Sequence, residues 1–204
     1  MIQRKTMTTQ RQERAARIGR QAAVVTMAWG VATAALTASW ALGGTLGLDQ
    51  LGSRIQEQAV DRETGFVAMI WLSAVGRLLV AALGLSLWFG RERSVPRRAL
   101  LAVGWLAGLG LTLYGVAGIG QAALALGGAI ARPASMGEAA VPWYLFLWEP
   151  LWLTGGLSLL VATAGYQIGS RPSARFRWAA RDIGERHARH AGSHAADRSW
   201  PRPG

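Results

Sequence analysis

The sequence predicts an all-α polytopic membrane protein, a bundle of four transmembrane helices with both ends of the chain in the cytoplasm. Three observations predict this class. Only 16% of the 204 residues are charged, whereas a soluble domain carries about a quarter. Long charge-free stretches alternate with short basic segments. The net charge of +11 is therefore carried by segments that flank hydrophobic spans, so it does not indicate a nucleic-acid-binding face.

Four apolar stretches are long enough to be spans, because a helix needs about 20 apolar residues to cross the hydrocarbon core. The first, 22–43, is uncharged and exceeds the roughly 7–15 apolar residues of a signal peptide, so we expect it to stay in the protein. The other predicted spans are 66–90, 99–119 and 143–168. The charge-free stretch continues past residue 119, and we expect its remainder to form an outer extension or an interfacial segment.

The distribution of arginine predicts the orientation. The segments at 1–21, 91–98 and from residue 171 onward are strongly basic. By contrast, residues 44–65 hold two arginines against four acidic residues, and residues 120–142 hold one of each. Basic segments stay cytoplasmic, so every connection agrees with four spans and an N-in, C-in orientation. Arginine is used almost to the exclusion of lysine, alongside many alanines and glycines, which is typical of a GC-rich bacterium and indicates a bacterial plasma membrane.

The spans divide the chain into a basic cytoplasmic tail at 1–21, a transmembrane domain at 22–168, and a second basic tail at 169–204. Both tails are expected to meet anionic lipids. In the second tail, Phe176 and Trp178 alternate with arginines, whereas the last part is rich in Gly, Ser, His and Pro and is expected to be disordered. The three histidines of that tail are loosely spaced, so we expect no metal site.

Aromatic and apolar residues near the outer ends of the spans predict two further features. Tryptophan is enriched at membrane interfaces, and most of the tryptophans fall near predicted span ends, with Trp40, Trp71, Trp143 and Trp148 at the outer end and Trp88 and Trp178 at the inner end. After the first span, apolar residues recur at helical spacing between acidic ones. This pattern predicts a short amphipathic helix that lies on the membrane.

Small residues predict how the helices pack. Gly104, Gly108 and Gly115, together with Thr112, lie on one face of the third span. Helices in lipid associate through close packing of small residues. We therefore expect this face to contact another helix of the same bundle, and dimerisation through the same groove is the alternative.

Two charged residues stand inside predicted spans and form a candidate intramembrane polar site. Arg77 lies about 16 Å into the second span, where an arginine costs roughly 2.5–3.5 kcal/mol on insertion scales. Glu149 enters the fourth span from the same outer side, and Pro150 follows it. A buried Arg77–Glu149 pair is possible if the second and fourth spans are neighbours. Pro150 predicts a kink or a new helix start, because it has no backbone N–H to donate.

The alternatives for function follow from these residues and from what is missing. There is no cysteine, no nucleotide-binding loop, no zinc-binding or nucleophile-elbow motif, and no histidine in a span. We therefore predict no catalytic residues and no cofactor. A structural or accessory membrane protein that stabilises a partner is the first hypothesis. A small transporter or channel with a polar site at Arg77 and Glu149 is the second, and it requires a polar cavity that reaches both residues.

Two segments resemble a known family. One closes the first span with Trp40, Gly43 and Gly44, and the other follows Glu149-Pro150 with Trp152, Gly155 and Gly156. Together they resemble an uncharacterised family of small four-helix bacterial membrane proteins, which is catalogued as a domain of unknown function. The resemblance covers about residues 22–168. It implies a four-helix fold and no particular activity.

The arginine asymmetry generates a prediction about topology. Reporter fusions at residues 5, 95 and 190 should read cytoplasmic, and fusions at residues 57 and 135 should read external, because basic segments stay inside. A cytoplasmic signal at residue 57 or 135 would contradict the four-span orientation.

Overall fold

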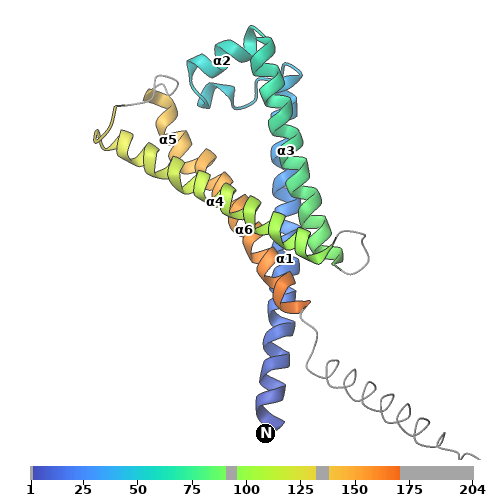
Figure 1. Cartoon of the computed structure of the whole chain (residues 1–204). Helices are drawn as coiled ribbons and strands as arrows, with labels where there is room; N and C mark the ends of the chain where they lie inside the picture. The colour runs from blue at the N-terminus through green and yellow to red at the C-terminus, as the bar shows by residue number, and fades with distance from the viewer. Residues whose placement is uncertain (1, 91–95, 132–137, 171–204) are drawn as a thin grey trace, which may run out of the picture. The chain divides into compact units, whose positions relative to one another are not determined.

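The computed structural model describes residues 2–90, 96–131 and 138–170 (Figure 1). The expectations for the tail at 171–204, including Trp178 and the histidines, lie outside these residues. The described chain is helical throughout, without a strand. Its elements are α1 (Ile2–Ala41), η1 (Leu48–Gln50), α2 (Ser53–Val60), α3 (Thr64–Phe89), α4 (Arg97–Leu126), η2 (Glu138–Ala140), α5 (Val141–Trp143), η3 (Tyr144–Trp148) and α6 (Glu149–Gly169).

Four segments are long and apolar enough to cross a membrane, namely Gln10–Ala41, Thr64–Phe89, Arg97–Leu126 and Val141–Gly169. This confirms the predicted all-α fold with four helices that are able to span a membrane. The helix boundaries differ from the predicted spans in two places. Helix α1 begins at Ile2, so the basic segment before residue 22 is helical. Helix α4 continues past residue 119 because Ala and Leu favour helix, and it ends where Gly127 and Gly128 follow.

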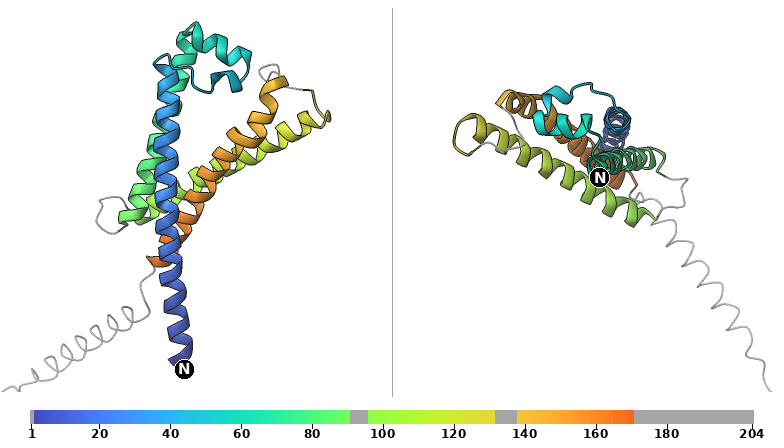
Figure 2. Two further views of the ribbon diagram at one scale, coloured as in Figure 1. Left: turned by 180° about the vertical axis from the view of Figure 1, so that it is seen from behind. Right: turned by 90° about the horizontal axis from the view of Figure 1, so that it is seen from above.

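The helices form two pairs, α1 with α3 and α4 with α6, and the contact between α1 and α6 joins the pairs. Helix α1 packs along α3 and along α6, and α4 packs along α6. Helix α3 meets α4 and α6 only over short stretches. Figures 1 and 2 show that the α1–α3 pair and the α4–α6 pair diverge toward the ends that carry α2 and α5. We call this the α2 end of the domain.

Glycines allow the paired helices to approach closely. A Cβ atom at Gly19 of α1 would lie 2.7 Å from the Cα of Gly165 in α6, so these two backbones touch. Along α4, the face predicted from the sequence contacts α6, with Gly104 against Thr163, Gly108 against Leu160 and Gly115 against the backbone of Leu153. Larger side chains at these positions would force the helices apart.

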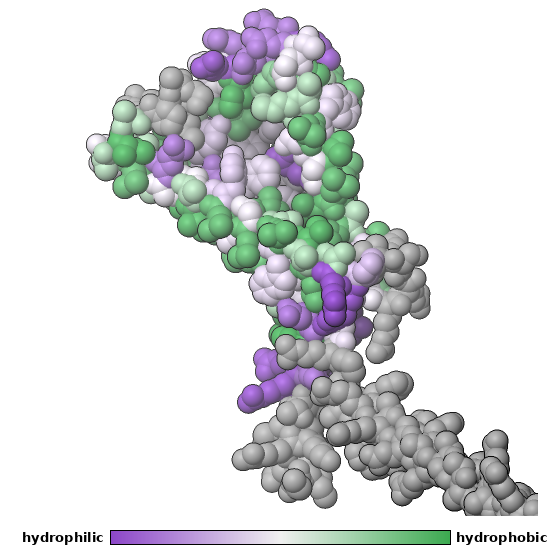
Figure 3. Space-filling view, in the orientation of Figure 1, coloured by the Kyte–Doolittle hydropathy of each residue, from purple (hydrophilic) through white to green (hydrophobic). Residues whose placement is uncertain are grey.

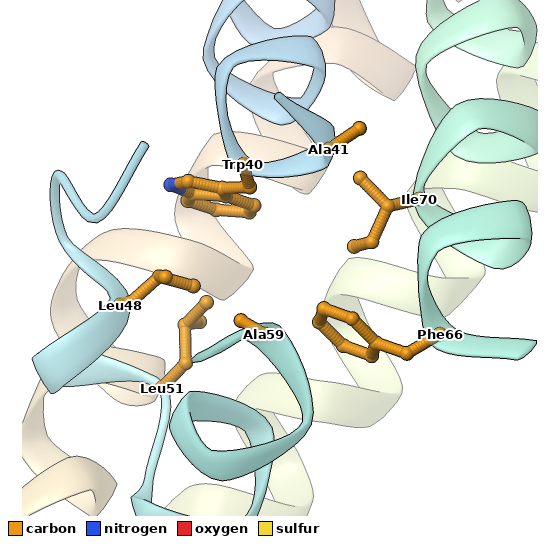
Figure 4. Close-up of a cluster of buried hydrophobic side chains, with 7 residues drawn as sticks. All are labelled: Trp40, Ala41, Leu48, Leu51, Ala59, Phe66 and Ile70. Atoms are coloured by element: carbon orange, nitrogen blue, oxygen red, sulfur yellow. The ribbon is translucent and has the colours of Figure 1, made fainter. Parts of the chain in front are cut away.

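A compact apolar cluster lies at the α2 end (Figure 4). Its buried members come from the end of α1, the η1–α2 segment and the start of α3, and they are Trp40, Ala41, Leu48, Leu51, Ala59, Phe66 and Ile70. The amphipathic segment that was expected to lie on the membrane therefore packs its apolar face against α1 and α3. Positive φ angles at Gly43 (+97°) and Gly47 (+75°) let the chain turn back for this packing, since glycine adopts them without steric cost.

The outward faces of the helices carry large apolar side chains that no other helix covers. Leu72, Leu79, Leu106, Leu113 and Phe146 are each at least 65% exposed, and the outer surfaces of both helix pairs appear green in Figure 3. A protein surface in water rarely exposes contiguous apolar area on this scale. Such a surface suits the hydrocarbon of a bilayer.

The packing of α4 on α6 generates a stability prediction. The variant Gly108→Leu should lower the thermal stability of the detergent-solubilised protein, because a Cβ at Gly108 would already lie 2.7 Å from the Leu160 side chain. The matched control is Gly110→Leu on the same helix, where a Cβ meets nothing within 4 Å. Equal stability of the two variants would show that the Gly108 face does not carry the contact.

Candidate functional site

A cavity of about 260 Å³ lies near the α2 end, between the two helix pairs. In Figure 3, less hydrophobic, pale surface lies in the hollow between the green faces of the two pairs. The lining residues come from α1, the η1–α2 segment, α3, α4, η3 and α6. The polar and aromatic ones are Trp29, Thr33, Thr37, Trp40, Gln58, Phe66, Arg77, Tyr114, Tyr144, Trp148, Glu149 and Trp152. The cavity is thus lined mainly by aromatic and aliphatic side chains, with one basic and one acidic residue.

Two aromatic groups form most of the wall. Toward α2, the rings of Trp40 and Trp148 meet edge to face at 5.7 Å. Deeper in the domain, Trp152 makes edge contacts with Trp29 at 5.9 Å and with Tyr114 at 5.2 Å. Such contacts are worth about 0.5–1.5 kcal/mol beyond the area that they bury. They hold the rings in place around the cavity.

The indole N–H groups of the wall differ in whether they have partners. Trp40 Nε1 donates to the Leu46 carbonyl at 2.8 Å, and Trp29 Nε1 donates to the Leu151 carbonyl at 2.7 Å. Trp148 Nε1 is buried without a hydrogen-bond partner. A buried polar group without a partner costs about 1–3 kcal/mol, so Trp148 contributes an unsatisfied donor to the wall of the cavity.

Arg77 projects from the middle of α3. Its guanidinium carbon lies 4.4 Å from the centre of the Trp152 ring, and its Nη1 donates to Ser73 Oγ on the same helix. The Nε atom is buried and has no hydrogen-bond partner. A desolvated cation–π contact is worth about 2 kcal/mol, which offsets part of the cost of an arginine at this depth. The buried Nε–H donor therefore remains unused.

Glu149 is the first residue of α6 and is only 4% exposed. Its carboxylate lies against Gly118 of α4, where any Cβ atom would overlap it. Gly115 leaves similar room for the Glu149 backbone carbonyl. The Oε2 atom has no hydrogen-bond partner. The glycines of α4 therefore make the space that the carboxylate occupies, and the carboxylate keeps an unused acceptor.

Pro150 accompanies a change of helical register. The five residues before Glu149 form a π-helical turn, Tyr144–Trp148, and α6 starts directly after it. Proline has no N–H for the carbonyl four residues earlier, and a π-turn accommodates this loss. Such turns occur often at functional sites. Here the turn joins Trp148 to Glu149, two of the residues that line the cavity.

Arg77 and Glu149 line the same cavity, but no ion pair between them is found in the part of the chain that the structure describes. The sequence allows such an ion pair only if the second and fourth spans are neighbours. Helices α3 and α6 meet only over a short stretch. There the guanidinium stacks on Trp152, one turn beyond Glu149, so each charged group keeps a polar atom without a partner.

The remaining residues singled out from the sequence have structural positions. Gly43 and Gly44 shape the turn after α1 and do not line the cavity. Gly155 lies against the Trp29 ring, and Gly156 lies against the backbone of Thr112. These two glycines allow α6 to approach α1 on one side and α4 on the other. Trp40 and Trp152, by contrast, are part of the cavity wall.

The sequence interpretation missed or misplaced several wall residues. Trp40 and Trp148 were assigned to an interfacial belt, but both turn inward because they pack against each other. Tyr114, Thr33 and Thr37 were not singled out. A signal for the α1 wall does exist, because Trp29, Thr33, Thr37 and Trp40 recur at helical spacing and form a polar and aromatic stripe in an otherwise apolar span.

Comparison with known proteins gives a family but no activity. No curated protein and no solved structure matches this chain. The family model described as protein of unknown function (DUF3995) matches residues 15–159. This range contains α1 from residue 15 onward, all of α3 and α4, and the residues of α6 that line the cavity. The match covers more than half of the chain, and the protein therefore belongs to the DUF3995 family of proteins of unknown function.

Proposed function

We propose that this chain is a four-span protein of the bacterial plasma membrane that binds a small molecule in the cavity beside Arg77 and Glu149. One observation carries the proposal. Three residues that line one cavity, Arg77, Trp148 and Glu149, each keep a buried polar atom without a partner among the described residues, namely Arg77 Nε, Trp148 Nε1 and Glu149 Oε2. Native proteins leave few such groups unsatisfied. A bound molecule that pairs with them removes the cost.

The composition of the wall supports a binding site over a purely structural role. Small-molecule sites are concave and mostly apolar or aromatic, with a few polar groups that fix orientation. The cavity has this composition. A protein that only stabilises a partner needs neither a cavity nor an intramembrane arginine. The transporter hypothesis required a polar cavity that reaches both charged residues. The cavity reaches both, but its wall is mainly apolar and aromatic, which favours a binding site.

The route of access follows from where the helices touch. Away from the α2 end, α1 and α6 are in backbone contact at Gly19 and Gly165, and α4 contacts α6 at Gly104 and Gly108. No residue of that half lines the cavity. With the α2 end outside, as the arginine distribution predicts, the cavity is a blind site that a ligand reaches from the outer side.

Cysteine accessibility tests the cavity, and the cysteine-free sequence makes single replacements clean. We expect Thr33→Cys and Leu36→Cys, which line the cavity, to react with a membrane-impermeant methanethiosulfonate reagent added from outside. The control is Ala35→Cys, next to Leu36 but on the exposed face of α1. A thiol in lipid stays protonated, and the thiolate is the reactive form, so the control should react at least about tenfold more slowly.

Two outcomes of this measurement would contradict the proposal. If neither Thr33→Cys nor Leu36→Cys reacts, water does not reach the cavity. If Ala35→Cys reacts as fast as both of them, the reagent reports general exposure of α1 instead of a cavity.

The position of Glu149 generates a second prediction. Gly118→Ala should lower thermal stability by roughly 1–3 kcal/mol, the usual cost of overpacking, because the added methyl displaces the Glu149 carboxylate. Gly120→Ala on the same helix meets nothing within 4 Å and should be neutral or stabilising, since alanine favours helix over glycine. Thermal unfolding of both variants in one detergent measures the difference, and equal stabilities would mean that the carboxylate lies elsewhere.

A further inference from the structure

We infer that the molecule bound in this cavity is a zwitterion, with its cationic group toward Glu149 and its anionic group toward Arg77. The inference rests on the proposed binding function and deepens it by naming the chemical class of the ligand. It is carried by the charges, the unsatisfied atoms and the size of the cavity.

The charge balance of the cavity favours a ligand of zero net charge. The cavity holds one basic and one acidic side chain, Arg77 and Glu149, which are not paired with each other. A ligand with a single charge would satisfy one of them and leave an uncompensated charge in a low-dielectric site, which is strongly unfavourable. A zwitterion satisfies both groups and keeps the total charge at zero.

The unsatisfied atoms specify where each end of the ligand binds. Arg77 Nε and Trp148 Nε1 are donors without partners, and both suit a carboxylate or a phosphate. Glu149 Oε2 is an acceptor without a partner, and it suits an ammonium group.

The size of the cavity limits the ligand to a small molecule or a headgroup. A cavity of about 150 Å³ accommodates benzene, which has six non-hydrogen atoms. A cavity of about 260 Å³ therefore accommodates roughly ten. This is the size of a small amino acid, a betaine, or the polar part of a zwitterionic phospholipid. The same chemistry can thus come from a free solute or from a lipid in the surrounding leaflet.

A series of isosteric probes tests the charge requirement. The full chain is placed in nanodiscs of phosphatidylglycerol, which offer no zwitterionic headgroup, and binding is followed by tryptophan emission and by the thermal shift. Glycine betaine is compared with 3,3-dimethylbutyrate, which has the same shape and carboxylate but no cation, and with choline, which has the cation but no carboxylate. A second arm replaces part of the lipid with phosphatidylethanolamine and adds no solute.

We expect stabilisation either by glycine betaine or in the phosphatidylethanolamine arm, and the arm that responds identifies the source of the zwitterion. The singly charged probes should bind at least about tenfold more weakly, a factor that corresponds to about 1.4 kcal/mol. The inference is overturned if a singly charged isostere binds as well as betaine, or if neither arm responds.

Charge-neutralising variants test whether Arg77 and Glu149 set the preference among these probes. A purely structural role of the two residues would leave that preference unchanged. With Glu149→Gln, the preference should shift from the zwitterion toward 3,3-dimethylbutyrate, and with Arg77→Gln it should shift toward choline. Matched controls are Arg54→Gln and Glu57→Gln, which remove the same charges from exposed positions of α2 and should leave the preference unchanged. If the Arg77 and Glu149 variants fold and their probe preferences are unaltered, the inference is contradicted. If these variants do not fold, the probe series on the wild-type chain decides whether the ligand is a zwitterion.

The cysteine measurements separate this inference from the proposed function. If Thr33→Cys is labelled from outside but no zwitterion binds, the cavity is accessible and only the ligand class is wrong. If Thr33→Cys is not labelled and no probe binds, both proposals fail.

Discussion

The close contact of α6 with two other helices is the constraint on which the rest of the structure depends. Glycines on α6 and its partners bring these helices into contact, at Gly165 on the α1 side and at Gly156 on the α4 side. In lipid there is little hydrophobic driving force between helices, so association relies on packing of this kind and on interhelical hydrogen bonds. The hydroxyls of Thr26 and Ser158 supply one such bond between α1 and α6, at 3.0 Å. Helices α3 and α4 are held mainly as outer members of the two pairs.

This arrangement also explains why a cavity exists. Because the backbone contact between α1 and α6, at Gly19 and Gly165, lies away from the α2 end, the two pairs diverge toward that end and leave a space that aromatic and aliphatic side chains line but do not fill. The helices are therefore in close contact in the half of the domain away from α2, and they are separated by a cavity in the half near α2. The apolar cluster under α2 covers part of the opening by joining η1 and α2 to α1 and α3. Polar groups that would be costly against lipid instead face an internal space.

Arg77 and Glu149 are each held in place by neighbouring residues and not by an ion pair with each other. The guanidinium lies on the Trp152 ring and bonds to Ser73, and the carboxylate occupies the room that Gly118 leaves. An ion pair between them would neutralise both charges and remove the need for a third group. Two charges that are separately supported, near each other and unpaired, are instead arranged to meet a molecule that carries both signs.

The sequence by itself determined the helices, because hydrophobic length and helix propensity are local properties. The uncharged stretches predicted four spans, the glycine spacing on α4 indicated the face that contacts α6, and Arg77 and Glu149 stood out because charge inside a span is costly. Only the tertiary structure decided which helices pack together and which side chains face the interior of the domain. Trp40 and Trp148 have the same sequence signature as interfacial tryptophans, and only the tertiary structure shows that they pack inward, against each other and the apolar cluster. Likewise, whether Arg77 meets Glu149 or Trp152 depends on how α3 crosses α6, and a crossing angle is set by packing between segments far apart in the chain.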